Sequence, residues 1–393
     1  MDIKPLIDFD CTSFKFAIIA RINVLTKVVK NLLLINFCLT IVVSIHAQPI
    51  DLNLTWARVG DSYGKLNIEN TTESVECAVF SPAENYIASG AKKGWEVTLW
   101  ETATGDKVWQ QKADEEIEVV DFTQDGKQVI AAGEDNKIRI YETLTGNLEH
   151  TIDNIAAFDA MDLSNQNHLL AVGDEAGQIL LFDTRTWKRL DLVKQGEDQH
   201  AGGQQGTDAD VNQLYFSPDD QYLLSAGRNH QVKLWQISDD QKLLPVRNYE
   251  GHAATVKSVR LSSDGKYVAA GAGGGNGVRI WDFETGDLLH HLPGTGMIME
   301  TVAFTPDGKY LFTGGNEGEG KIGEEVENAG FENNDGMGHI YVYKAPEEGK
   351  RKFELVLKKP VFRQEFFDFS NDGKLLVTSH EDGTVRLWGV VRN

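Results

Sequence analysis

The residues best suited to chemistry in this 393-residue chain are carboxylates gathered in two polar segments. Segment 316–337 carries one lysine, Lys321, among seven carboxylates: Glu317, Glu319, Glu324, Glu325, Glu327, Glu332 and Asp335. Segment 194–210 adds the oxygen-rich set Glu197, Asp198, His200, Asp208 and Asp210. Such charge favours a cationic partner or a calcium ion, which binds six to eight oxygens. No alternating Asp-x-Asp-x-Asp-Gly loop is present, so we expect no cofactor, with Ca²⁺ as the alternative.

Other catalytic and metal-binding patterns receive little support. The zinc motif H-E-x-x-H and the redox motif C-x-x-C are both missing. His290 and His291 fall in an expected strand, where alternation sends their rings to opposite faces and prevents joint chelation. His252 could serve as a ligand, but we expect a structural histidine that is hydrogen-bonded inside the fold. The sequence therefore predicts a protein that is not an enzyme.

Composition narrows the class of protein. The chain is 41% hydrophobic, 25% charged and 9% aromatic, which is typical of globular proteins. Thirty-eight Lys and Arg against 59 Asp and Glu give a net charge of −21, which argues against nucleic-acid binding. Three cysteines exclude a disulfide framework.

The N-terminus has the pattern of a secretory signal. Several basic residues precede an uncharged stretch of 14 residues, 32–45, which ends close to the small residue Ala47. We expect residues 1–47 to be a signal peptide that is cleaved after Ala47; the alternative is a membrane anchor. The mature protein would then be secreted or periplasmic, without stable membrane insertion. Its one cysteine, Cys77, lies in an apolar run and is expected to be buried. We also expect a bacterial source.

A repeat organises the rest of the chain. Related blocks begin near residues 75, 117, 155, 211, 252, 296 and 361, with aligned apolar residues Phe80, Phe122, Leu163, Phe216, Leu261, Phe304 and Phe369. An aromatic residue follows in each copy: Trp100, Tyr141, Phe182, Trp235, Trp281, Tyr343 and Trp388. Each copy reads as strands, and an Asp-Gly turn recurs between strands at Asp125-Gly126, Asp264-Gly265 and Asp372-Gly373. Units of this length with four strands predict an all-β, seven-bladed propeller of antiparallel blades.

The last copy lacks its outer strand, because the chain ends shortly after Trp388. We expect the N-terminal segment 48–74 to supply that strand, since an open sheet edge would otherwise remain. Two stretches compete. Register with the other blades favours Lys65–Ile68, whereas alternation of apolar residues favours Leu52–Val59.

At these residues the chain resembles the WD-repeat family. The clearest matches are Gly251-His252, Trp281-Asp282 and the run from Glu381 to Trp388. The family's buried Asp-His-Ser/Thr-Trp network is incomplete, because Lys359-Pro360 stands where blade seven should carry Gly-His. The resemblance implies structural roles for Trp100, Asp135, Tyr141, Phe182, Trp235, His252, Trp281, Tyr343, Thr378, Asp382 and Trp388.

Family topology places segments 194–210, 271–277 and 316–337 on one face, called the top face, over blades four to six. Long loops on a rigid scaffold commonly carry binding sites. We therefore expect a non-catalytic, monomeric, extracytoplasmic scaffold for a protein or peptide. The candidate contact residues are Glu197, Asp198, His200, Asp208, Asp210, Asn276, Glu324, Glu325, Phe331, Asp335 and His339.

Two alternatives remain open: a propeller that binds a small ligand, a glycan or calcium, and a secreted propeller hydrolase or dehydrogenase. Carboxylates or histidines that converge in the central channel would favour an enzyme. A ring of aromatic residues there would favour a glycan. A wide top surface with an apolar centre and a charged rim would favour the scaffold.

Overall fold

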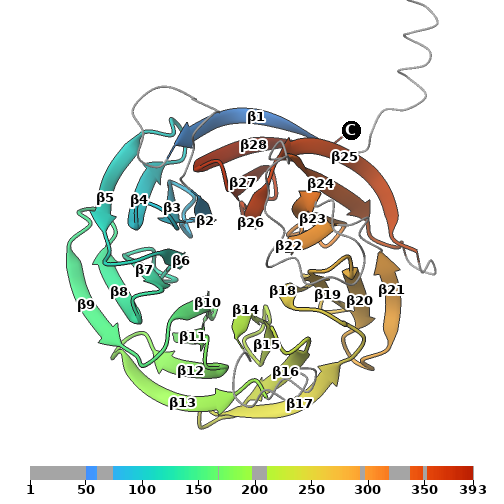
Figure 1. The fold of residues 1–393 in the computed structure, drawn as a ribbon, viewed down its shortest axis with the longest axis horizontal. Coiled ribbons are helices and arrows are strands. Elements are labelled where there is room, and N and C mark those ends of the chain that lie inside the picture. The colour runs from blue at the N-terminus through green and yellow to red at the C-terminus, as the bar shows by residue number, and fades with distance from the viewer. Residues whose placement is uncertain are drawn as a thin grey trace, which may run out of the picture. The chain divides into compact units, whose positions relative to one another are not determined.

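The computed structural model describes residues 50–59, 74–166, 168–196, 210–292, 297–317, 337–347 and 352–392. These residues form one compact unit. Their 28 strands make seven four-stranded antiparallel sheets, arranged as a ring of blades (Figure 1). The predicted seven-bladed propeller is confirmed. Within these ranges there is no helix long and apolar enough to cross a membrane.

Blades one to three follow one another along the chain, each running from its innermost to its outermost strand. Blade one contains β2 (Val75–Phe80), β3 (Tyr86–Ala91), β4 (Glu96–Glu101) and β5 (Lys107–Lys112). Blade two contains β6 (Ile117–Phe122), β7 (Gln128–Gly133), β8 (Lys137–Glu142) and β9 (Leu148–Asp153). Blade three contains β10 (Phe158–Leu163), β11 (Leu169–Asp174), β12 (Gln178–Asp183) and β13 (Lys188–Lys194).

Blades four to six repeat this order. Blade four contains β14 (Val211–Phe216), β15 (Tyr222–Gly227), β16 (Val232–Ile237) and β17 (Leu243–Tyr249). Blade five contains β18 (Val256–Leu261), β19 (Tyr267–Ala272), β20 (Gly277–Asp282) and β21 (Leu288–Leu292). Blade six contains β22 (Met297–Phe304), β23 (Tyr310–Glu317), β24 (Met337–Lys344) and β25 (Glu354–Phe362).

Blade seven joins the two ends of the propeller. It contains β26 (Gln364–Phe369), β27 (Leu375–His380), β28 (Thr384–Arg392) and, as its outer strand, β1 (Ile50–Val59). Strand β1 is antiparallel to β28, with Leu52 opposite Val390 (Figure 1). The ring is therefore closed by β1, which contains Leu52–Val59, the stretch that the alternation of apolar residues favours. The competing stretch Lys65–Ile68 lies outside the described residues.

The core lies between neighbouring blades. One apolar cluster combines Trp56, Val377 and Val385 of blade seven with Val75 and Trp100 of blade one. The outermost strands are largely exposed, as in β5 and β9. Burying both faces of each blade against its neighbours requires the complete ring, because a single blade leaves its apolar faces in water.

An aspartate and a glycine stabilise the turn between the first and second strands of blade seven, as the sequence predicts. In blade seven, Ser370 Oγ donates to Asp372 Oδ1 at 3.0 Å, and the same oxygen accepts the backbone N–H of Lys374. Gly373 then adopts φ +65°, which glycine tolerates without strain. These links lie on the face of the propeller opposite the top face.

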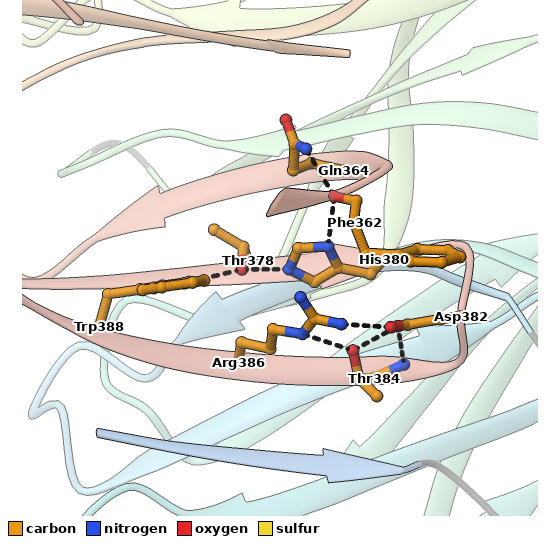
Figure 2. Close-up of polar contacts among 8 residues, drawn as sticks. All are labelled: Phe362, Gln364, Thr378, His380, Asp382, Thr384, Arg386 and Trp388. Atoms are coloured by element: carbon orange, nitrogen blue, oxygen red, sulfur yellow. Dashed lines mark hydrogen bonds and ion pairs between the residues drawn. The ribbon is translucent and has the colours of Figure 1, made fainter. Parts of the chain in front are cut away.

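Blade seven contains a buried polar chain (Figure 2). Trp388 Nε1 donates to Thr378 Oγ1 at 2.9 Å, and this hydroxyl lies 2.6 Å from His380 Nε2. His380 Nδ1 lies 3.0 Å from the carbonyl oxygen of Phe362. Since a carbonyl only accepts, the proton sits on Nδ1 and Thr378 donates to Nε2. Asp382 takes no part and pairs instead with Arg386 and Thr384.

His380 therefore supplies the histidine of this hydrogen-bond network in blade seven, where Lys359-Pro360 stands in place of the family's Gly-His. It reaches Thr378 from two residues further along the same strand, because alternate side chains of a strand share a face. Burial and the Arg386 charge hold the pKa of His380 well below its usual value. The neutral ring is the form that this hydrogen-bond chain requires.

Blades one and four contain a shorter hydrogen-bond chain, in which the tryptophan of the third strand donates to a serine of the second strand. Trp100 Nε1 donates to Ser89 Oγ at 2.8 Å, and Trp235 Nε1 donates to Ser225 Oγ at 2.7 Å. In blade five the equivalent position is Ala270, and Trp281 Nε1 donates to a backbone carbonyl. His252 packs edge-on against the Trp281 ring, and its buried Nε2 has no hydrogen-bond partner among the described residues.

The remaining residues with expected structural roles all lie on third strands or beside them. Tyr141 and Phe182 are buried, and Tyr343 is half-buried. Asp135 pairs with Arg139 in blade two, in the same arrangement as Asp382 with Arg386 in blade seven. Cys77 is free and buried, as the sequence predicts.

Candidate functional site

The central channel widens at its top mouth into a polar cavity of about 250 Å³. Its wall includes residues from the links between second and third strands, such as Lys92 and Glu134. It also includes Asp210, from the link between blades three and four. The cavity therefore opens on the top face, where the sequence analysis expects function.

A β-bulge in every innermost strand shapes this wall. The pairing register between first and second strands shifts in all seven blades, at the second residue of the first strand in six of them and at the fourth residue of β22 in blade six. In β6, for example, Ile117 and Val119 are paired but Glu118 between them is not. A bulged residue leaves the ladder, so its side chain is free to point elsewhere.

The seven bulged residues all line the cavity: Glu76, Glu118, Asp159, Asn212, Lys257, Glu300 and Glu365. Five of them are carboxylates, and each stands four positions before the aligned apolar residue of its repeat. The apolar and aromatic columns of the repeats give no indication of this ring. The signal was nevertheless present, since five of the seven repeats carry a carboxylate in this column.

A second layer of charge surrounds the mouth. Lys92, Glu134, Glu175, Arg228 and Glu381 follow the second strands of their blades, and each backbone N–H donates to the carbonyl that precedes the bulge by two residues. Lys92 Nζ lies 3.4 Å from Glu116 and 3.9 Å from both Glu76 and Glu118. We call these five residues the rim.

Crowded, buried carboxylates have perturbed acidities. Burial and the neighbouring Glu76 raise the pKa of Glu118 to about 9. Burial and Asp210 raise the pKa of Asp159 to about 7. Burial alone would lower the pKa of Lys92, but the surrounding carboxylates outweigh it and the pKa rises. The mouth therefore favours any group that brings positive charge.

A second cavity is lined by Asp121 and Asp368. The charge of Arg260, whose guanidinium lies over the rings of Tyr215 and Phe366, acts on both of these carboxyls and on Asp162. Asp162 accepts the backbone N–H of Phe216, and Asp368 accepts that of Phe80 at 2.8 Å. These bonds tie blade three to blade four and blade seven to blade one.

Three of the predicted contact residues lie in the described part of the chain. Asp210 lines the top mouth. Asn276 lies in the glycine-rich link of blade five, where its Oδ1 accepts the N–H of Ala253 at 3.3 Å. His339 lies on β24, where its ring is 5.8 Å from that of Tyr341. The others, Glu197, Asp198, His200, Asp208, Glu324, Glu325, Phe331 and Asp335, lie outside the described residues.

The chain also contains two short matches to catalytic sequence motifs. Gly60-Asp61-Ser62-Tyr63-Gly64 fits G-x-S-x-G, and Gly315 to Lys321 fits G-x-x-x-x-G-K. A nucleophile elbow needs a strand-to-helix turn, whereas the described elements are all strands, and a phosphate loop needs Ser or Thr where Ile322 stands. Residues 60–64 and 318–321 lie outside the described residues, and neither match has the sequence or structural context that its chemistry requires.

Comparison with known proteins agrees with the fold. The family model described as "Nucleolar protein 10-like, N-terminal domain" matches residues 118–319, just over half of the chain. The model "WD domain, G-beta repeat" matches residues 366–389 of blade seven.

Curated proteins with similar sequences share only part of their length with this chain. Protein LST8 homolog of Drosophila melanogaster is 26% identical over 166 residues, which cover 41% of this chain and 49% of that protein. Target of rapamycin complex subunit wat1 of Schizosaccharomyces pombe is 34% identical over 98 residues, 25% and 28% of the two chains. Periodic tryptophan protein 2 of Arabidopsis thaliana is 21% identical over 298 residues, 62% and 33%. The chain thus spans half or less of each of these relatives.

Proposed function

This chain belongs to the WD-repeat β-propellers and, within them, to the family described as nucleolar protein 10-like, N-terminal domain; on that basis we propose that it is a non-catalytic scaffold for a basic protein segment. The binding surface in this proposal is the top face, and the partner is a protein or peptide. The observation that carries it is the ring of five carboxylates at the top mouth of the channel.

Charge complementarity supports a basic partner. Carboxylates outnumber lysines in the cavity wall, and the top-face insertion 316–337 is strongly acidic as well. Opposite charges across an interface speed association and help select the partner. One similar protein is, by its name, a subunit of a complex, which agrees with a role in assembly.

Exposed apolar side chains on the same face could anchor a partner. Trp95 follows Lys92 in the link of blade one and is 41% exposed, with φ +60°. Ile155 lies in the link between blades two and three and is 86% exposed. Aromatic and aliphatic anchors commonly supply much of the binding energy of protein interfaces. These residues add blades one to three to the surface that we expected over blades four to six.

The proposed binding surface also includes the insertions over blades four to six. The described flanks of segment 194–210 end at Gly196 and resume at Asp210, which lines the mouth. Strands β23 and β24, which flank segment 316–337, pair as far as Asn316 and Gly338. We place the protein outside the cytoplasm, because residues 1–47 have the pattern of a signal peptide. The proposal includes no cofactor and treats the protein as a monomer.

Converging carboxylates are the feature that we associated with an enzyme, and they are present. The described cavity wall nevertheless holds no Ser, Thr, Tyr or His, and its thiol, Cys77, is buried. Phe366 is its one aromatic residue, which gives little support to a glycan site. A carboxylate ring without a nucleophile suits cation recognition better than group transfer.

The test is affinity capture from an extracytoplasmic extract, read by mass spectrometry. The bait is the full chain, beside a variant in which 194–210 and 316–337 are replaced by short Gly/Ser links. A control variant replaces 345–347, which follow β24 and lie on the opposite face. We expect a partner that the full chain and the control retain and the top-face variant loses. A partner that all three retain would contradict the proposed surface.

A further inference from the structure

Three neighbouring residues at the top mouth of the channel combine charges of opposite sign. Lys257, Glu300 and Glu365 are the bulged residues of β18, β22 and β26, the innermost strands of blades five, six and seven, which follow one another around the channel (Figure 1). We call these three residues the charged triplet. It places one cationic side chain and two carboxylates on one side of the same cavity.

The charged triplet has binding capacity that the described residues leave unused. Lys257 and Glu300 make no hydrogen bond or ion pair with another described residue. The Oε1 atom of Glu365 is buried, and it also has no hydrogen-bond partner among the described residues. Native structures normally satisfy such a buried atom with a protein group, a water or an ion. The triplet therefore offers both a donor and acceptors to a molecule that enters the cavity.

Other parts of the mouth are paired within the protein. Lys92 Nζ lies 3.4 Å from Glu116 and 3.9 Å from Glu118, so these carboxylates have a cation beside them. Asn212 Nδ2, in blade four, donates to the carbonyl oxygen of Val256 at 3.0 Å. Blades five to seven differ from this arrangement, because the cation of the charged triplet is not bound to its carboxylates.

The charges of the triplet nevertheless act on one another through the cavity. Glu300 is the main cause of the raised pKa of Lys257, which outweighs the opposite effect of burial and keeps this side chain a cation. Burial, Glu300 and Glu76 raise the pKa of Glu365 well above its usual value. A cation beside Glu365 would favour its ionised form. Two carboxylates against one ammonium group also favour a ligand with more ammonium than carboxylate groups.

We propose that the charged triplet binds a free basic α-amino acid. The carboxylate of the amino acid pairs with Lys257, and its two cationic groups pair with Glu300 and Glu365. The cavity of about 250 Å³ lies just below the range of ligand pockets, about 300–1,000 Å³, and suits a ligand of one amino acid. The ring of Phe366, which lines the same cavity, offers an apolar surface to the methylene groups of the ligand. This site does not depend on the protein partner proposed above.

Calorimetric titration of the full-length protein with L-lysine tests the site, beside two analogues that each lack one group. Cadaverine is lysine without its carboxylate, and 6-aminohexanoate is lysine without its α-ammonium group. We expect L-lysine to bind with a Kd on the order of 0.1–1 mM, since the ligand is small and its groups are charged. Each analogue should bind at least about tenfold more weakly, because it loses a hydrogen bond between charged groups.

Two variants assign the contacts. Lys257→Met should weaken the binding of L-lysine at least about tenfold without weakening that of cadaverine, a change of preference that a merely structural role would not produce. Glu365→Gln should weaken the binding of both ligands. Lys188→Met is the matched control and should keep full affinity, because Lys188 is exposed at the start of the outer strand β13.

Three results would overturn the proposal. The first is the absence of binding heat with L-lysine up to about 10 mM, ten times the weakest expected Kd. The second is equal affinity for L-lysine and cadaverine, because Lys257 would then bind no carboxylate. The third is an unchanged preference for L-lysine in Lys257→Met. Affinity capture of a protein partner is a separate measurement, so this proposal and the proposed function can fail independently.

Discussion

Asp368 Oδ2 accepts a hydrogen bond from the backbone N–H of Phe80 at 2.8 Å, although the two residues are 288 positions apart. The bond crosses the joint between the last and the first blade, on the inner side of the ring. The outer side of blade seven is completed by β1, whose Trp56 Nε1 donates to the Thr102 carbonyl of blade one. The ring is thus closed at both its inner and its outer radius.

We predict that Asp368→Asn and Asp368→Leu will differ. Asparagine keeps an acceptor for Phe80 and removes a charge whose burial raises the pKa of Asp368 to about 6. At pH 8 this variant should be about 2–3 kcal/mol more stable than the unmodified protein. At pH 5 the difference should shrink to about 1–2 kcal/mol, because folded Asp368 is then protonated while the unfolded carboxyl is still ionised. Leucine leaves the N–H without a partner and should cost about 1–3 kcal/mol at pH 5. Urea unfolding at both pH values measures these differences. Equal effects of the two substitutions would contradict a hydrogen-bonding role.

Stability should fall as the pH rises from 5 to 8. Burial raises the pKa of Asp162 to about 7 and that of Asp368 to about 6, in a group that also contains Asp121, Arg260 and Tyr215. A carboxyl with a raised folded-state pKa stabilises the fold below its unfolded pKa, and this contribution is lost as the pH passes the folded pKa. Exposed turn aspartates such as Asp372, with a pKa of about 2, act only below about pH 4.

Asp159, Asp162 and Asp368 together should lower the free energy of unfolding by about 6 kcal/mol between pH 5 and pH 8. The buried histidines His252 and His380, whose pKa values burial lowers, offset about 4 kcal/mol of this, because keeping them neutral is costly only below about pH 6.5. We therefore expect the free energy of unfolding to be larger at pH 5 than at pH 8 by about 2 kcal/mol. Urea denaturation over this range, at constant ionic strength, gives the difference. A profile that is flat or rises towards pH 8 would show that these aspartates stay ionised in the folded protein.

The blade-seven hydrogen-bond chain predicts a large effect of Thr378→Val. Valine has the shape of threonine but leaves Trp388 Nε1 and His380 Nε2 buried without partners. The expected loss is about 2–4 kcal/mol. Thr151→Val on the exposed outer strand β9 is the control and should change stability by less than about 0.5 kcal/mol. Similar losses for both variants would mean that the chain of bonds contributes little.

Blade five offers the reverse experiment. Ala270 occupies the position of Ser89, Ser225 and Thr378, and the buried Nε2 of His252 in the same blade has no hydrogen-bond partner among the described residues. Ala270→Ser should give that nitrogen a hydroxyl and stabilise the protein by about 1 kcal/mol. Ala269→Ser, the buried neighbour on the other face of β19, should destabilise it. A gain in neither melting temperature nor urea midpoint for Ala270→Ser would contradict the assignment.

The fold could be predicted from the sequence because its signals are local. Asp-Gly turns such as Ser370 to Gly373 occur in four of the seven repeats, and short strands of β-branched and aromatic residues recur along the chain. The partner of β28 was harder to identify, since β1 is more than 300 residues away and its local sequence competes with Lys65–Ile68. His380 was missed because it replaces the family histidine from a different position. Of the residues at the mouth of the channel, Asp210 could be predicted, whereas the carboxylate ring could not be placed there, because a strand pattern alone does not show that a bulge turns these side chains towards the channel.

Binding at the top mouth is tested most directly by a pair of charge-matched variants in the affinity capture. Glu300→Gln with Glu365→Gln removes two carboxylates from the mouth. Glu284→Gln with Glu354→Gln removes two exposed carboxylates elsewhere. We predict that the partner is lost or strongly weakened by the first pair and retained by the second, with binding that weakens as salt is raised. Equal retention by both variants would contradict the central claim that the acidic top mouth is the binding site.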